Sequence, residues 1–230
     1  MNWLIDIDKS LFRQFYGSDS AVADIIMLDI TTWWVWIPFY LFCIVILMKN
    51  KENSVKVFTI LAFAILCFAI TEIIADVVLK PLVGRLRPCY EPSLADLFQQ
   101  YSIGYHPRGY SFCSAHAANM CGVACYLALL FRNRTATIFL SIWAFLCCYS
   151  RIYLGAHYPI DVIVGAMIGV GVAFLCNYLM SMFEKRNSLS SRYVSRSLTS
   201  TGYLLTDIYA MIILLQLTYI VIIIHSVISA

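Results

Sequence analysis

The sequence predicts an all-α fold, an integral-membrane helical bundle of about six helices with its polar chemistry at one membrane face. Of the 230 residues, 61% are hydrophobic and only 13% are charged, and the mean hydropathy is +0.79. A soluble domain carries about a quarter of charged residues, so a bilayer must surround most of this chain. A net charge of +3, scattered along the chain, gives no reason to expect nucleic acid as a partner.

Five or six segments are long and apolar enough to cross a bilayer, whose core of about 30 Å needs about 20 apolar residues per helix. They are residues 31–48, 57–79, 112–131, 136–154, 160–183 and 204–228. Residues 1–30 alternate apolar and acidic character, and their stretch 2–28 predicts an amphipathic helix on the membrane surface. We treat residues 1–230 as one membrane-embedded domain.

The charges of the connecting loops predict the orientation of the bundle. Loops 49–56, 132–135 and 184–203 are rich in Lys and Arg, which places them on the cytoplasmic side. The opposite side then holds residues 80–110, the turn near 151–159 and both termini. A compact chain with positive cytoplasmic loops suits a bacterial inner membrane, with the polar segments on its periplasmic, outer face.

Seven of the nine cysteines lie inside apolar runs, where cysteine behaves as a small buried hydrophobic residue. Cys89 and Cys113 lie in or beside a polar loop instead. A disulfide between these two in an oxidising compartment stays open as an alternative to two free thiols.

Three polar segments fall on the same predicted face: residues 80–88, 110–116 and 150–161. Together they supply three cations, two histidines, one carboxylate and one hydroxyl, namely Lys80, Arg87, Arg151, His116, His157, Asp161 and Ser114. Lys and Arg bind phosphate oxygens, and a His–Asp pair can act as a nucleophile and the group that orients it. The three segments therefore predict one phosphate site at the membrane surface.

These motifs resemble those of the type-2 phosphatidate phosphatase superfamily: Lys-x6-Arg-Pro, Pro-Ser-Gly-His, and Ser-Arg-x5-His-x3-Asp. Residues 80–88 and 150–161 match the first and third motifs without a gap. The middle motif departs, with Cys113 where proline is usual and Ala115 where glycine is usual. An alanine at a position that requires a positive φ would weaken the phosphate site.

The resemblance implies a lipid phosphatase that forms a phosphohistidine on His157, with Asp161 holding the other ring nitrogen. His116 would protonate the leaving oxygen and later activate water. The phosphate oxygens would be bound by Lys80, Arg87, Arg151, Ser114 and the backbone N–H of Ala115. The fixed cations make a metal or other cofactor unnecessary, and we find no metal-ligand spacing in the sequence.

The substrate would be a phosphate monoester or pyrophosphate of a lipid drawn from the bilayer. Undecaprenyl pyrophosphate and lipid A are favoured, phosphatidylglycerol phosphate and phosphatidate stay open, and the loop 89–109 is the expected selector. A catalytically decayed membrane protein that only binds or senses lipid phosphate is the alternative.

Several polar residues have two interpretations from the sequence. Glu72 and Asp76 form a helical stripe leading to Lys80, which favours structural pairing with a basic partner over a proton path. For Arg85 and Arg108 the sequence favours neither of two roles over the other: support of the phosphate-binding residues, or anchoring to lipid headgroups. His106 and His225 are expected to be interfacial residues rather than catalysts.

Overall fold

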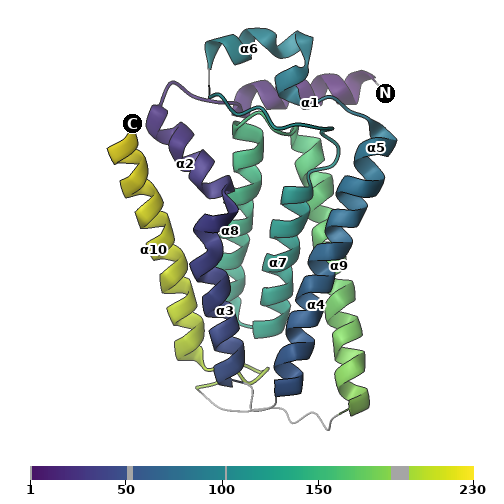
Figure 1. The fold of residues 1–230 in the computed structure, drawn as a ribbon, viewed down its shortest axis with the longest axis vertical. Helices are drawn as coiled ribbons and strands as arrows, with labels where there is room; N and C mark the ends of the chain where they lie inside the picture. The colour runs from purple at the N-terminus through teal and green to yellow at the C-terminus, as the bar shows by residue number, and fades with distance from the viewer. Residues whose placement is uncertain (1, 51–53, 102, 188–196) are drawn as a thin grey trace.

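The structure, a computed structural model, describes residues 2–50, 54–101, 103–187 and 197–230; most of the serine-rich loop 188–201 and its basic residues lie outside these ranges. Within them the chain is helical and contains no β-strand. Six long helices stand side by side (Figure 1): α3 (Ile37–Asn50), α4 (Ser54–Glu72), α7 (Ala115–Phe131), α8 (Arg134–Tyr153), α9 (Pro159–Asn187) and α10 (Leu205–Ser229). They correspond to the six predicted spans. Counted with the turns that adjoin them, all but α7 are long and apolar enough to cross a membrane, and α7 has 17 residues.

The second span extends beyond α4 and delivers the first motif to the end of the bundle. A π-helix, η2 (Ile73–Leu79), and one α-helical turn, α5 (Lys80–Val83), follow α4 directly. Gly84 ends this helix in the left-handed conformation, with φ of +60°. A residue without Cβ adopts this conformation at little cost, and the chain then turns to cross the top of the bundle.

The N-terminal segment is two helices rather than the single surface helix that the sequence predicts. Only α1 (Asn2–Phe15) lies across the end of the bundle, whereas α2 (Ala21–Thr31) descends beside α8 and α10 (Figure 1). The break falls at Gly17, whose φ is +61°, and at Ser20, whose Oγ accepts the Ala23 N–H at 3.3 Å. Ser at an N-cap starts a new helix, so the local turn chemistry overrides the continuous amphipathic pattern.

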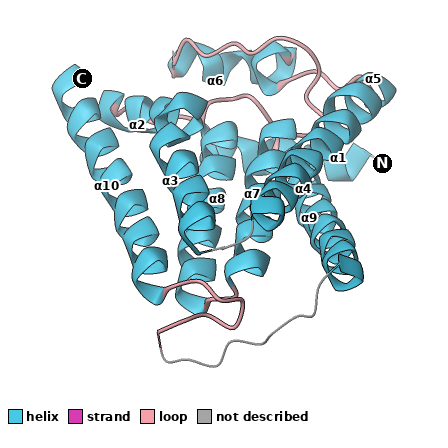
Figure 2. Cartoon of the chain, turned by 60° about the horizontal axis from the view of Figure 1, so that its bottom comes forward, coloured by secondary structure: helices cyan, strands magenta, loops and turns pink. Residues whose placement is uncertain are grey.

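The remaining short helices precede the first span or lie in the loop above the bundle. The 3₁₀ turn η1 (Trp33–Trp36) joins α2 to α3. The 3₁₀ turns η3 (Pro88–Tyr90) and η4 (Pro92–Leu94), followed by α6 (Ala95–Gln100), form the loop above the bundle, next to α1 (Figures 1 and 2).

Helix α7 is the central helix, and two glycines let α9 approach it closely. A Cβ on Gly165 would lie 2.4 Å from the Ser114 carbonyl oxygen, and one on Gly169 would lie 2.0 Å from that of Ala118. Small residues at this spacing allow membrane helices to pack backbone against backbone. The start of α7 and the start of α9 are therefore held together, and both carry predicted site residues.

All three motif segments meet at one end of the bundle, as the loop charges predict. The end of α5, the start of α7 and the α8–α9 connection lie at the top of Figure 1, together with both termini. The α7–α8 junction and the end of α3 lie at the opposite end. The predicted convergence of the motifs is thus present in the fold.

Candidate active site

His157 lies in the connection between α8 and α9 and is buried, with 2% of its surface exposed. Its Nδ1 lies 2.8 Å from the Ser111 carbonyl oxygen, and its Nε2 lies 3.3 Å from Nη1 of Arg87. A carbonyl only accepts and a guanidinium only donates. Nδ1 therefore carries the proton, and the lone pair of Nε2 accepts a hydrogen bond from the fixed cation of Arg87.

The surroundings of His157 keep its ring neutral. The pKa of His157 falls from 6.5 to about 4, chiefly because the ring is buried; Asp161 raises the pKa, whereas the charges of Arg151 and Arg87 lower it. A neutral imidazole is the nucleophilic form. At neutral pH the ring thus has the charge state that attack on phosphorus needs.

Asp161, in the first turn of α9, does not hold His157 directly, which corrects the predicted contact. Its Oδ2 lies 3.9 Å from Nδ1, too far for a hydrogen bond. Oδ2 instead accepts the Ser111 hydroxyl at 2.5 Å and the Tyr158 N–H at 3.0 Å. Because the Ser111 carbonyl binds Nδ1, Asp161 orients the histidine through Ser111.

Arg87 is buried and rigidly oriented. Besides its contact with His157, its Nε donates to the Gly109 carbonyl and its Nη1 to the Ala156 carbonyl, each at 3.1 Å. Both carbonyls belong to loops around His157, so they aim the guanidinium at Nε2 of the histidine. The structure thus places Arg87, a predicted phosphate-binding residue, beside His157.

Arg151, in the last turn of α8, is buried with an unsatisfied donor. Its Nη1 donates to the Thr31 hydroxyl at 2.5 Å and to the Tyr105 hydroxyl at 2.9 Å. Its Nε is buried and has no hydrogen-bond partner in the part of the chain that the structure describes. An unpaired buried donor costs about 1–3 kcal/mol, so a ligand that accepts this proton would relieve a real penalty.

The start of α7 contributes a histidine, a hydroxyl and the positive end of a helix dipole. Within the described residues, Nε2 of His116 is buried without a partner, and Arg151 and His157 interact with this ring electrostatically. Ser114 caps the helix, its Oγ accepting the Ala117 N–H at 3.2 Å. Backbone N–H groups at a helix start bind anions, which suits the expected oxyanion contact at Ala115.

Ala115 adopts an ordinary helical conformation as the first residue of α7. Among the described non-glycine residues, positive φ occurs at Arg132, at the far end of that helix. The backbone strain that an alanine could cause in the middle motif is therefore absent. Cys113 is buried and, like Cys89, is a free thiol, so the considered disulfide is not formed.

Lys80 pairs with a carboxylate on its own helix rather than with another predicted site residue. Its ammonium group forms an ion pair with Asp76, one turn earlier on the same helix. Glu72, the other member of the predicted stripe, accepts from the Asn119 side chain of α7 at 2.7 Å. Asp76 has the expected basic partner, whereas Glu72 is paired with an amide.

The structure also locates the polar residues that had two interpretations from the sequence, and one residue that the sequence did not single out. Arg85 pairs with Asp8 at 2.7 Å and with Asp161 at 2.8 Å, and its side chain is 20% exposed. His225 pairs with Asp29 at 2.7 Å, and Arg108 is exposed. Ser111 was missed because it lies outside the recognised motif.

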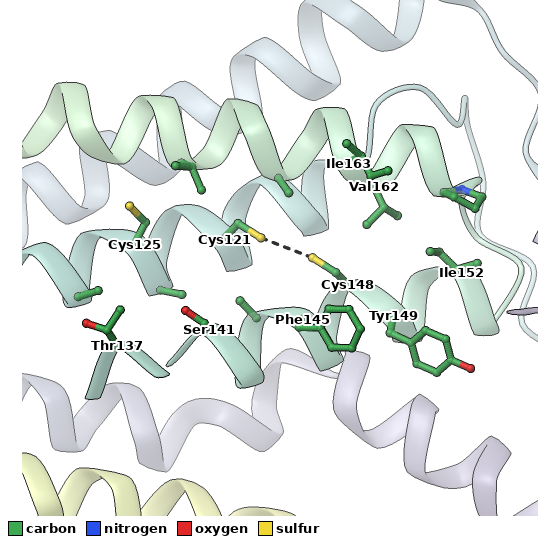
Figure 3. Close-up of a pocket in the computed structure, with 16 residues that line it drawn as sticks. Cys121, Cys125, Thr137, Ser141, Phe145, Cys148, Tyr149, Ile152, Val162 and Ile163 are labelled. Carbon is green, nitrogen blue, oxygen red and sulfur yellow. Dashed lines mark hydrogen bonds between the residues drawn. The ribbon is translucent and has the colours of Figure 1, made fainter. Parts of the chain in front are cut away.

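An apolar groove runs down the bundle from the catalytic end, between α8 and α9 and over α7 (Figure 3). Its volume is about 500 Å³. Ile152 and Pro159, which flank the His157 connection, line one end, and Thr137 and Ala128, close to the α7–α8 junction, line the other. The groove therefore connects the level of the histidine with the opposite end of the bundle.

Comparison with known proteins agrees with this architecture. The chain is 40% identical over 170 residues to the lipid A 4'-phosphatase of Bacteroides thetaiotaomicron, covering 74% of this chain and 75% of that protein. It is 27% identical over 174 residues to an undecaprenyl-diphosphatase of Sulfolobus acidocaldarius, covering 74% and 77%.

The fold matches the crystal structure of a transmembrane PAP2 type phosphatidylglycerolphosphate phosphatase from Bacillus subtilis. The TM-score is 0.59 at 22% identity, with 83% of this chain and 90% of that chain covered. The family model of the PAP2 superfamily matches residues 55–185, which include all three motifs. The chain therefore belongs to the PAP2 superfamily.

Proposed function

We propose that this membrane protein is a lipid phosphatase that removes a phosphate monoester from lipid A, through a phosphohistidine on His157, at the periplasmic face of a bacterial inner membrane. The observation that carries the proposal is the unprotonated Nε2 of His157, which accepts a hydrogen bond from Nη1 of Arg87 at 3.3 Å. Two buried polar atoms without partners among the described residues, His116 Nε2 and Arg151 Nε, support it.

In the first step, Nε2 of His157 attacks phosphorus, the bond from phosphorus to the lipid oxygen breaks, and protonated His116 gives its proton to that oxygen. The phosphorylated imidazolium keeps its Nδ1 proton on the Ser111 carbonyl. In the second step, His116 takes a proton from water, water oxygen bonds to phosphorus, and the P–N bond breaks. Inorganic phosphate leaves, and His157 returns to its neutral form.

The cations supply most of the catalytic power, because phosphoryl transfer depends mainly on positioning and charge stabilisation. Arg87, Arg151 and the N-terminus of α7 surround the expected position of the phosphate. Lys80 would join them by exchanging Asp76 for a phosphate oxygen. These side chains provide enough positive charge for a mechanism that needs no metal ion.

The groove between α8 and α9 supports a lipid substrate over a water-soluble ester. It is lined almost wholly by apolar side chains and begins beside the His157 connection. A phosphate bound at His157 would thus leave an attached acyl chain at the mouth of the groove. The relative of Bacteroides thetaiotaomicron favours lipid A as the substrate.

Undecaprenyl pyrophosphate is the second candidate. The relative of Sulfolobus acidocaldarius favours it, at lower identity. The same catalytic groups would serve, since they contact the phosphoryl group and the leaving oxygen, which both substrates share.

The test is phosphate release by the protein purified in detergent, with lipid A, undecaprenyl pyrophosphate, phosphatidylglycerol phosphate and phosphatidate as substrates. We expect lipid A to lose one phosphate by mass spectrometry, with the 4' phosphate removed, in the presence and absence of EDTA. His157→Ala should abolish release, and His225→Ala, a histidine paired with Asp29 outside the site, should not. Binding of these lipids without turnover would favour the sensor alternative and contradict the proposal.

A further inference from the structure

The N-terminal helix α1 places a carboxylate against the catalytic end of the bundle. Asp8 is fully buried although most residues around it on α1 are exposed. Its Oδ2 accepts Nη2 of Arg85 at 2.7 Å, and its Oδ1 accepts the backbone N–H of Ile160 at 3.0 Å. Burying a carboxylate is costly unless it is paired and hydrogen-bonded, and both oxygens of Asp8 are satisfied by groups next to the site.

The contact with Ile160 completes the N-terminus of α9. Tyr158, which precedes Pro159, is not one of the residue types whose short side chains cap the start of a helix, namely Ser, Thr, Asp and Asn. Asp161 reaches back to the Tyr158 N–H, in the manner of a capping box. The N–H of Ile160 would be left over, and Asp8 accepts it across the interface. The α1 carboxylate thus fixes the turn that carries Asp161.

Arg85 links the two carboxylates. Its Nη1 donates to Asp161 Oδ1 at 2.8 Å while its Nη2 binds Asp8, and the guanidinium stacks on the Tyr158 ring at 3.8 Å. The planar guanidinium can hold two carboxylates in fixed directions, which a lysine ammonium cannot do. Without this cation, two buried anions would face each other.

The chain of contacts continues to the reacting nitrogen. Asp161 uses its other oxygen to accept the Ser111 hydroxyl at 2.5 Å, and the Ser111 carbonyl holds His157 Nδ1 at 2.8 Å. A shift of Asp161 would therefore move Ser111, rotate the imidazole and misdirect Nε2. Neither Asp8 nor Arg85 touches the reacting atoms.

We propose that Asp8 and Arg85 are positioning residues of the phosphatase, which fix Asp161 and the first turn of α9 and so hold His157 in its attacking orientation. The proposal rests on the proposed function. It makes helix α1 part of the active site, in addition to any contact that it makes with the membrane surface.

The test compares Asp8→Asn and Arg85→Lys with Arg13→Ala, measuring kcat and KM per folded molecule on the lipid that the wild-type protein hydrolyses. Arg13 lies on the same helix and pairs with Asp96 at 3.0 Å, an exposed contact apart from Asp161. A small misplacement of a reacting group can cost about a hundredfold. We expect kcat to fall about tenfold to a hundredfold in both network variants, with KM nearly unchanged.

The controls separate positioning from general stability. Arg13→Ala should keep kcat within about twofold, since exposed ion pairs contribute little. The double variant, which combines Asp8→Asn with Arg85→Lys, should lose no more kcat than the single variant with the lower kcat, because both residues act through Asp161. If Arg85→Lys is poorly folded, Asp8→Asn still tests the proposal, since it keeps the shape of the side chain and the acceptor for Ile160.

Wild-type kcat in both network variants would overturn the positioning role, and so would a rise in KM at constant kcat. An equal loss in Arg13→Ala would overturn it in favour of general docking of α1. A wild-type protein that is inactive on all four lipids would instead contradict the proposed function, and the positioning role with it.

Discussion

Arg87 Nη1 lies 3.3 Å from Nε2 of His157, with the histidine's other nitrogen bound to the Ser111 carbonyl. This relationship fixes the tautomer of the ring and places a permanent cation beside its unprotonated nitrogen. Both are needed for an attack on a phosphate anion, because the cation offsets the repulsion between lone pair and phosphate oxygens.

Replacing Arg87 should therefore cost most of the activity. We expect Arg87→Ala to lower kcat/KM by about 10²–10³-fold, the range seen when a single charge-stabilising donor is removed. Phosphate release by the purified variant measures this. Arg134→Ala is the matched control, an exposed arginine in the first turn of α8 at the opposite end of the bundle. Equal activity of the two variants would contradict the role of Arg87.

His157 should take up a proton only when the pH falls to about 4. Burial lowers its pKa to about 4, below the 6.5 of an ordinary histidine. NMR of the protein with ¹⁵N-labelled histidine, with His157→Ala for assignment, should show a neutral ring until the pH approaches 4. Titration near 6.5 would contradict the neutral nucleophile.

The same shift makes stability depend on pH. Between pH 6.5 and 4 the unfolded chain takes up a proton at this histidine, whereas the folded chain does not. The contribution of His157 to the free energy of unfolding therefore falls as the pH is lowered through this window. In His157→Ala this part of the pH dependence should disappear from melting curves.

Gly165 should be irreplaceable, since its hydrogen faces the Ser114 carbonyl. In Gly165→Ala the new Cβ would lie 2.4 Å from that oxygen, so α9 must move away from α7. We expect a loss of about 1–3 kcal/mol in the free energy of unfolding and a lower kcat. Gly171→Ala on the same helix meets nothing within 4 Å and should stabilise the protein slightly. Similar melting temperatures for the two variants would refute the close packing.

Ala115→Gly restores the residue that the middle motif usually has, and we expect no gain in activity from it. Ala115 begins α7 in an ordinary helical conformation, so glycine relieves no strain and adds flexibility, at a cost of up to about 1 kcal/mol. A clear rise in kcat would show that the alanine does restrict the phosphate site.

The spans and the location of the site could be predicted from the sequence because their signals are local. Runs of apolar residues define the six helices, and loop charges place residues 80–88, 110–116 and 150–161 at one end. The prediction of a single N-terminal helix was wrong because the amphipathic pattern continues on both sides of the turn and so does not reveal the break. Gly17 and Ser20 were the local signals of the break.

The partners of Asp161 could not be predicted because they come from distant parts of the chain. Asp8 lies 152 positions before Ile160, the residue next to Asp161, and Arg85 lies 76 positions before Asp161. One signal was available: Asp8 and Phe12 on α1, and Tyr16 directly after that helix, recur at every fourth position and are all buried. A carboxylate on an otherwise apolar stripe indicates a buried cation nearby.

Trapping of the covalent intermediate tests the central claim most directly. Rapid quenching of the wild-type protein during turnover of ³²P-labelled lipid should leave the label on the protein, whereas His116→Ala, which lacks the acid of the first step and the base of the second, should form the intermediate slowly. We predict an acid-labile, alkali-stable phosphate on His157 by mass spectrometry, and none in His157→Ala. Phosphate release by the wild-type protein with no label on His157, or with label on another residue, would contradict the account.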